Sequence, residues 1–125
     1  MITRNDIEKF IAAKFADTGW IEVPSAWYAT SITAGATPLK YRKIGNTVHF
    51  YGSLKTTIQR NAKTTYTAVT LPAELNPSET RFIPQVNANF DSCVAIVESG
   101  VIKWCNIPIL GANGVMFFHL SYLTD

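Results

Sequence analysis

The sequence has 125 residues, of which 47% are hydrophobic and only 16% are charged. This length suits one domain with a hydrophobic core, and the apolar content excludes an intrinsically disordered chain. The net charge of +2 is too small to favour strong binding to nucleic acid or to an anionic membrane, and it leaves so little charge repulsion that a permanently associated subunit has to be considered.

Residues 1–18 predict one short amphipathic helix. Asn5 and Glu8 form a capping-box pattern at its start, and Gly19 closes the segment. Four apolar residues fall on one stripe at helical spacing, namely Ile7, Phe10, Ile11 and Phe15. A helix of about three turns is not stable alone, so we expect this stripe to rest either on its own domain or on the same helix of neighbouring subunits.

Residues 19–125 have the pattern of an all-β domain, with short Thr-, Val-, Ile- and aromatic-rich runs between Gly, Pro and Asn turn signals. The clearest unit is 39–57, where Gly45-Asn46 predicts a two-residue hairpin turn that pairs Arg42 with His49. Side-chain alternation then separates an apolar face from a basic and aromatic one, which carries Lys40, Arg42, His49, Tyr51, Ser53 and Lys55.

Further strands are expected at 64–71, 81–87, 89–98, 101–107 and 115–123, with Pro72, Pro77, Pro84 and Pro108 marking ends, bulges or edges. Their number and spacing predict an antiparallel β-sandwich or jelly roll. The run 115–123 is largely apolar on both faces, since one face carries Val115, Phe117, His119 and Leu123 and the other carries Met116, Phe118, Leu120 and Tyr122. We therefore expect both faces to be covered, and the second cover could be another subunit.

Two cysteines, Cys93 and Cys105, flank the expected turn Ser99-Gly100. A two-residue loop would place Cys93 opposite Asn106 and point the thiols to opposite faces, whereas a three-residue loop would bring them together. The spacing leaves the bonding of these cysteines open. No secretion signal is visible at the N-terminus, which favours reduced thiols.

The sequence shows no phosphate-binding Gly loop, no paired-His metal motif and no Gly-x-Ser-x-Gly nucleophile elbow. The acids Glu74, Glu79, Asp91 and Glu98 are spread over the predicted loops and strand ends. We therefore expect a protein that is not an enzyme and has no metal or cofactor.

Aromatic residues suggest a different kind of site, because a sugar ring stacks on an aromatic face while its hydroxyls form hydrogen bonds to nearby polar groups. Trp20, Trp27, Tyr28 and Trp104 are the candidates, and Trp104 is preferred because it lies near a hairpin loop. The alternative for each is a place in the core. Arg42, His49 and Tyr51 on the basic and aromatic face could meet phosphate or sugar, or could simply be solvated.

Several segments together resemble the C-terminal head domains of tail-fibre and baseplate receptor-binding proteins of phages that infect Gram-positive bacteria. The resemblance covers the chain from about Asp17 to the C-terminus. It is carried by the order of Asp17-Thr18-Gly19-Trp20, the run Tyr41-Arg42-Lys43-Ile44-Gly45-Asn46-Thr47-Val48 leading into Tyr51-Gly52, Leu71-Pro72 with Asn76-Pro77, and Ser99-Gly100-Val101-Ile102.

This resemblance implies a compact antiparallel β head that forms a homotrimer in the virion and binds host cell-wall saccharide without catalysis. It implies contacts to other virion subunits. The small net charge adds the expectation that neither nucleic acid nor a membrane is a partner. The expected saccharide residues are Trp104, Trp27, Tyr28, Arg42, His49 and Tyr51, and the expected subunit interface is Ile7, Phe10, Ile11, Phe15, Phe117 and His119. The alternative is a purely structural virion protein, either a baseplate accessory or a capsid fibre or decoration subunit.

Overall fold

The computed structural model describes the backbone of residues 1–124 and the side chains of these residues except 10–15. One helix, α1 (Arg4–Phe15), precedes nine strands and two short 3-10 turns, η1 (Ser25–Trp27) and η2 (Ala73–Leu75). The strands are β1 (Ile21–Glu22), β2 (Ile32–Ala34), β3 (Lys40–Ile44), β4 (Thr47–Thr56), β5 (Thr64–Thr70), β6 (Arg81–Asn87), β7 (Ser92–Glu98), β8 (Val101–Asn106) and β9 (Val115–Leu123).

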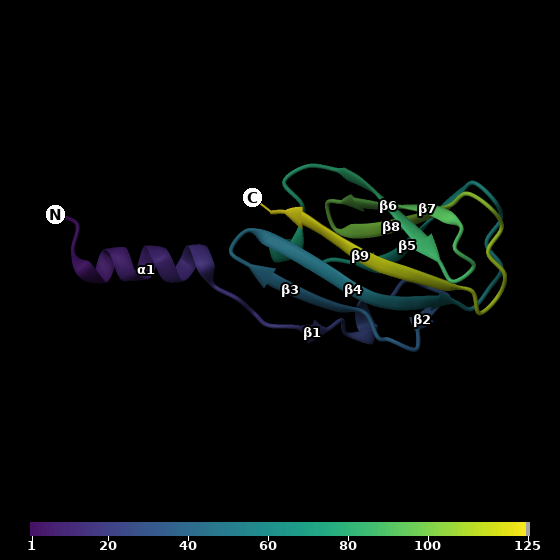
Figure 1. The fold of residues 1–125 in the computed structure, drawn as a ribbon, viewed down its shortest axis with the longest axis horizontal. Coiled ribbons are helices and arrows are strands. Elements are labelled where there is room, and N and C mark those ends of the chain that lie inside the picture. Colours follow the sequence, from purple (N-terminus) through teal and green to yellow (C-terminus); the bar gives the residue numbers. More distant parts are fainter. Residues whose placement is uncertain (125) are drawn as a thin grey trace.

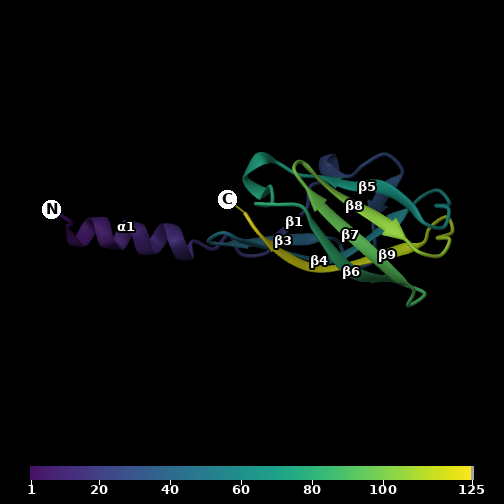
Figure 2. The ribbon, with the colours of Figure 1, turned by 90° about the horizontal axis from the view of Figure 1, so that it is seen from above.

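The strands form one antiparallel sheet in the order β1-β3-β4-β9-β6-β7-β8-β5, with β2 paired to the end of β4. The sheet curls so that its first half, β1-β3-β4-β9, lies across from its second half, β6-β7-β8-β5 (Figures 1 and 2). The predicted antiparallel all-β fold with one short N-terminal helix is therefore confirmed. The two layers of the predicted sandwich are halves of a single continuous sheet.

Two hairpins follow the register that their turns predict. Gly45 has a φ of 56°, which glycine adopts without strain, and the turn pairs Ile44 with Thr47 and Arg42 with His49. Glu98 likewise pairs with Val101 across Ser99-Gly100. In this second hairpin Cys93 lies opposite Asn106, and Cys93 and Cys105 are both free thiols.

The core fills the space between the two halves of the sheet. Trp104 of β8 packs against Phe118 of β9 with ring centroids 5.0 Å apart. From the same strand β9, Tyr122 donates a hydrogen bond of 2.7 Å from its hydroxyl to the carbonyl of Leu75 in η2. The alternate residues of β9 that face inward are all buried, namely Met116, Phe118, Leu120 and Tyr122. Only one apolar face of this strand is covered within the chain, because Phe117 and Leu123 on its outer face are exposed.

Helix α1 begins two residues before the position that the sequence pattern indicated. Its N-cap is Thr3, whose side chain accepts a hydrogen bond from the backbone of Asp6 while the Asp6 carboxylate accepts one from the Thr3 N–H. The predicted capping pair of Asn5 and Glu8 is therefore wrong. The helix extends away from the sheet in both views (Figures 1 and 2), and of the helices in the described residues none is long and apolar enough to cross a membrane.

Candidate functional site

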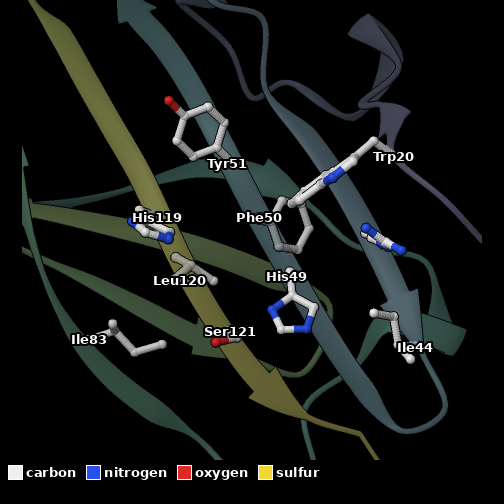
Figure 3. Close-up of a pocket in the computed structure, with 10 residues that line it drawn as sticks. Trp20, Ile44, His49, Phe50, Tyr51, Ile83, His119, Leu120 and Ser121 are labelled. Atoms are coloured by element: carbon white, nitrogen blue, oxygen red, sulfur yellow. The ribbon is translucent and has the colours of Figure 1, made fainter. Parts of the chain in front are cut away.

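An open groove of about 480 Å³ lies on the outer face of β3, β4 and β9 (Figure 3). It contains aromatic, imidazole, hydroxyl and aliphatic side chains but no carboxylate among its lining residues. These residues are Trp20, Arg42, Ile44, His49, Phe50, Tyr51, Ile83, His119, Leu120 and Ser121. The groove unites three of the residues predicted for saccharide binding, Arg42, His49 and Tyr51, with His119, which was predicted for the subunit interface.

Strand register brings these side chains together. Tyr51 of β4 lies directly opposite His119 of β9, and His49 lies directly opposite Ser121. Because alternate residues of a strand share a face, all four side chains lie on the outer side of the sheet. Figure 3 shows His49 and Tyr51 along β4 and His119 and Ser121 along β9. Four polar groups thus stand in two adjacent rows on a rigid sheet.

Trp20 borders this groove from the segment between α1 and β1. Its side chain is 49% exposed, and Figure 3 shows it extending toward β4. Gly19, with a φ of 67°, precedes it and donates its N–H to the carboxylate of Asp17 at 2.8 Å. The sequence named Trp20 among the candidate aromatic residues but did not place it beside His49 and Tyr51, because the contact is between a loop and strands that follow later in the chain.

The cation of the groove is already paired. The Arg42 Nε donates to the Asp17 carboxylate at 2.9 Å, and the Arg42 Nη2 forms a second bond to the same group. The hydrogen bond from Arg42, together with that from the Gly19 N–H, lowers the pKa of Asp17 from 3.8 to about 2. Arg42 therefore holds the segment before β1 against β3, and its charge is largely balanced by Asp17.

Trp104 does not lie in this groove. Its side chain is 0% exposed, so neither face of its ring is open to a ligand, and its Nε1 has no hydrogen-bond partner. Ala95 lies opposite Trp104 in the β7–β8 pairing, and this small side chain leaves space for the indole in the core. The prediction that Trp104 binds a saccharide is therefore wrong for this fold.

Trp27 and Tyr28 also lie outside the groove. Trp27 is half-buried and packs against Tyr41 with ring centroids 5.4 Å apart. Tyr28 forms an isolated bridge with Val69 of β5, and burial raises the pKa of its hydroxyl. Both residues close the side of the core between β3 and β5 rather than extending the aromatic surface at His49.

The predicted interface residues are divided between two places. Ile7 is exposed on α1, whereas Phe117 and His119 are exposed on the outer face of β9. The side chains of Phe10, Ile11 and Phe15 lie outside the described residues.

Ser121 was not singled out from the sequence. Its signal was the alternation of β9, which puts it two residues after His119 on the same face.

Within residues 1–124, no group of three or more His, Cys, Asp and Glu side chains is arranged to hold a metal ion. No protein-family model matches this chain, and no curated protein has a matching sequence.

Proposed function

We propose that this chain is a noncatalytic receptor-binding head of a bacteriophage virion, and that the groove at Tyr51 and His119 binds saccharide of the host cell wall. The proposal of saccharide binding rests on one observation, the composition of the groove. Two accessible aromatic rings, Trp20 and Tyr51, lie there together with polar groups, namely the imidazoles of His49 and His119 and the hydroxyl of Ser121. A sugar ring needs this combination, because its apolar face stacks on an aromatic ring while its hydroxyls take directed hydrogen bonds. The virion setting depends on the sequence resemblance to phage head domains.

The charges in the groove favour a neutral or anionic saccharide over a cationic one. None of its lining residues carries a carboxylate, and the Asp17 carboxylate nearby is engaged by Arg42 and Gly19. Lys40, which lies opposite Tyr51 in the β3–β4 pairing, adds a positive charge at the border. An amino sugar with a free ammonium group would find no partner here.

We propose a homotrimer as the form in which the head acts. Helix α1 extends away from the sheet, Ile7 is exposed, and the sequence pattern places Phe10, Ile11 and Phe15 on the same stripe. Association of this stripe between copies would remove apolar surface from water. Three weak sugar sites on one particle, repeated over many copies, would then give firm attachment by avidity.

The test is binding of the full chain to immobilised wall polysaccharide from Gram-positive bacteria, measured in parallel for the wild type and for Trp20→Ala. We expect saturable binding that soluble polysaccharide of the same strain displaces and that Trp20→Ala weakens. A wild-type protein that is folded by circular dichroism and binds none of the polysaccharides would contradict the proposal.

One observation favours a second candidate, a structural virion subunit. Val86 of β6 and Phe117 of β9 are directly paired and both exposed, and Phe82 of β6 is 69% exposed. Such apolar side chains on adjacent strands suit contact with another coat or baseplate protein. This candidate predicts that deleting the gene impairs particle assembly or stability and that the surviving particles adsorb normally.

A further inference from the structure

The two halves of the sheet are joined between β6 and β9, and this junction opens beside the groove. Backbone pairing between the two strands is confined to Val86 with Phe117 and Asn87 with Met116. If the same register continued, Pro84 would lie opposite His119 and Phe82 opposite Ser121. The ladder ends before these positions, although both strands continue past them.

Pro84 explains why the ladder ends. The backbone N–H of Ala88 donates to Val115 of β9, whereas that of Asn87 donates to Asp91 toward β7, so even-numbered residues of β6 face β9. Position 84 therefore faces β9 as well, and proline has no N–H to give.

The side chain of Gln85 takes the place of the missing strand contact. Its Oε1 accepts a hydrogen bond of 2.7 Å from the His119 N–H, and its Nε2 donates to the His119 carbonyl at 3.3 Å. The amide thus satisfies both backbone groups of His119. Two residues further along β9, at Ser121, the Gln85 side chain offers no such substitute, because its amide is already used by His119.

The backbone of Ser121 is directed into this opening. Thr124 donates its N–H to Asn46 beside β4, so even-numbered residues of β9 face β4 and odd-numbered residues face β6. Of the odd-numbered residues, His119 is held by Gln85, and the carbonyl of Leu123 accepts from the Ser78 N–H at 2.8 Å. Ser121 lies between them, is exposed and lines the groove.

We infer that the backbone N–H and C=O of Ser121 are the polar anchor of the groove and bind two adjoining hydroxyls of a saccharide. This inference rests on the proposed function. In an antiparallel ladder, such a residue exchanges two hydrogen bonds with the residue opposite it. Neighbouring sugar hydroxyls offer the same complement, since one donates to the C=O while the other accepts from the N–H. The ring bearing them then lies among Tyr51, His119 and Trp20.

The occupied neighbours of Ser121 argue against a peptide strand in this opening. A strand added to a sheet edge pairs with successive alternate residues. Here both backbone groups of His119 and the carbonyl of Leu123 already have partners on that side, so among His119, Ser121 and Leu123 only Ser121 has both its N–H and its C=O open. A small polyol fits this single donor and acceptor better than an extended chain does.

The experiment distinguishes the contribution of the Ser121 backbone to saccharide binding from that of the Ser121 hydroxyl. Ser121→Pro removes the N–H and keeps the β4–β9 ladder, which uses even-numbered residues, whereas Ser121→Ala removes only the hydroxyl. Leu123→Pro is the matched control, because it makes the same change on the same side of β9 outside the groove lining. Each full-length variant is titrated with the methyl glycosides of glucose, galactose, rhamnose and N-acetylglucosamine and with deoxy analogues, followed by NMR of the ¹⁵N-labelled protein.

We expect Ser121→Pro to weaken binding about tenfold, the size expected for the loss of one or two hydrogen bonds. Ser121→Ala, which loses only the hydroxyl, should weaken binding less than Ser121→Pro does, and Leu123→Pro should bind within about twofold of the wild type. In the free wild-type protein, the Ser121 amide should exchange with solvent faster than those of Leu120 and Tyr122, and bound glycoside should slow it. A slowly exchanging Ser121 amide in the free protein, or normal binding by Ser121→Pro, would overturn the inference while leaving the proposed function intact. A rapidly exchanging Ser121 amide with no glycoside binding by the wild type would instead overturn the proposed function and the ligand inferred from it.

Discussion

Tyr51 of β4 and His119 of β9 lie directly opposite each other, with ring centroids 5.7 Å apart and ring planes at 86°. The edge of one ring therefore faces the other, an arrangement that aromatic pairs prefer. The contact links the predicted basic and aromatic face of β4 to the apolar outer face of β9. It makes one surface out of two features that the sequence presented separately.

Removing the aromatic rings of the groove should weaken saccharide binding without unfolding the protein. Tyr51→Ala and Trp20→Ala are each expected to reduce the affinity for wall polysaccharide about three- to tenfold, the range that corresponds to one aromatic contact. Phe90→Ala is the matched control, because Phe90 is 87% exposed and is not among the groove residues. Equal binding by all three variants in a polysaccharide titration would contradict the assignment of the groove.

Replacing Trp104 should affect stability rather than recognition. Trp104→Ala leaves a cavity beside Phe118, and we expect the free energy of unfolding to fall by about 3 to 5 kcal/mol. Urea denaturation followed by circular dichroism measures this loss. Trp20→Ala, which removes a half-exposed indole, should cost less than about 1 kcal/mol. A comparable loss for the two tryptophans would show that Trp104 is less deeply packed than the structure indicates.

Asp17→Asn should remove a pH-dependent part of the stability. The hydrogen bond from Arg42 keeps the pKa of Asp17 at about 2 in the folded protein, below its usual 3.8. Because the folded-state pKa is the lower one, the ionised carboxylate stabilises the fold fully above about pH 4, and this contribution is lost as the pH falls through about 2. The difference in unfolding free energy between wild type and Asp17→Asn should therefore shrink between about pH 5 and pH 2.

Asp6→Asn is the control for that pH series. The pKa of Asp6 is also lowered, first by the backbone N–H of Thr3, but this carboxylate caps α1 and does not contact the sheet. We expect its replacement to leave the unfolding of the sheet unchanged at every pH. If the Asp6→Asn and Asp17→Asn variants follow the same pH dependence, the Asp17–Arg42 pair is not its origin.

The two thiols should react separately with a thiol reagent. Cys93 is buried and burial raises the pKa of its thiol, whereas Cys105 is partly exposed. In the native protein, we expect Cys105 to be modified first and Cys93 only after denaturant is added. Cys105→Ser should abolish the fast reaction, as followed by mass spectrometry. A native mass two hydrogens lower than that of the reduced chain would contradict free thiols.

The state of association tests the role proposed for α1. Light scattering of the full chain should give three times the mass of one chain, and Ile7→Lys should shift the protein toward monomer because it places a charge on the apolar stripe. Asn5→Lys is the control, since Asn5 is exposed and lies off that stripe. A wild-type protein that remains monomeric at micromolar concentration would contradict the homotrimer.

The sequence by itself determined the local parts of this protein. The turns at Gly45-Asn46 and Ser99-Gly100 set the register of two hairpins, because a two-residue loop allows only one pairing of the flanking strands. The strands 81–87 and 115–123 were also predicted with the observed bounds. Alternation alone was enough to put Arg42, His49 and Tyr51 on one face.

The alternation of side chains along β8 was also enough to place Trp104 on the buried face, since Lys103 and Cys105 occupy the opposite face. The position of Trp104 near the hairpin loop therefore does not expose its ring, because side-chain alternation turns the ring into the core. Ala95, which makes room for the indole, lies on a different strand, and its contribution depends on the pairing of β7 with β8.

The candidate site was decided by tertiary structure. It required β4 to pair with β9, which places Tyr51 opposite His119 although the two residues are 68 positions apart in the sequence, so no local pattern joins them. It also required Trp20 to fold back over β3 through the Asp17–Arg42 pair and β6 to leave β9 at Pro84. Local propensities fix turns and faces, whereas contacts between distant segments depend on how the whole sheet curls around its core, which is why the groove could be seen only in the folded chain.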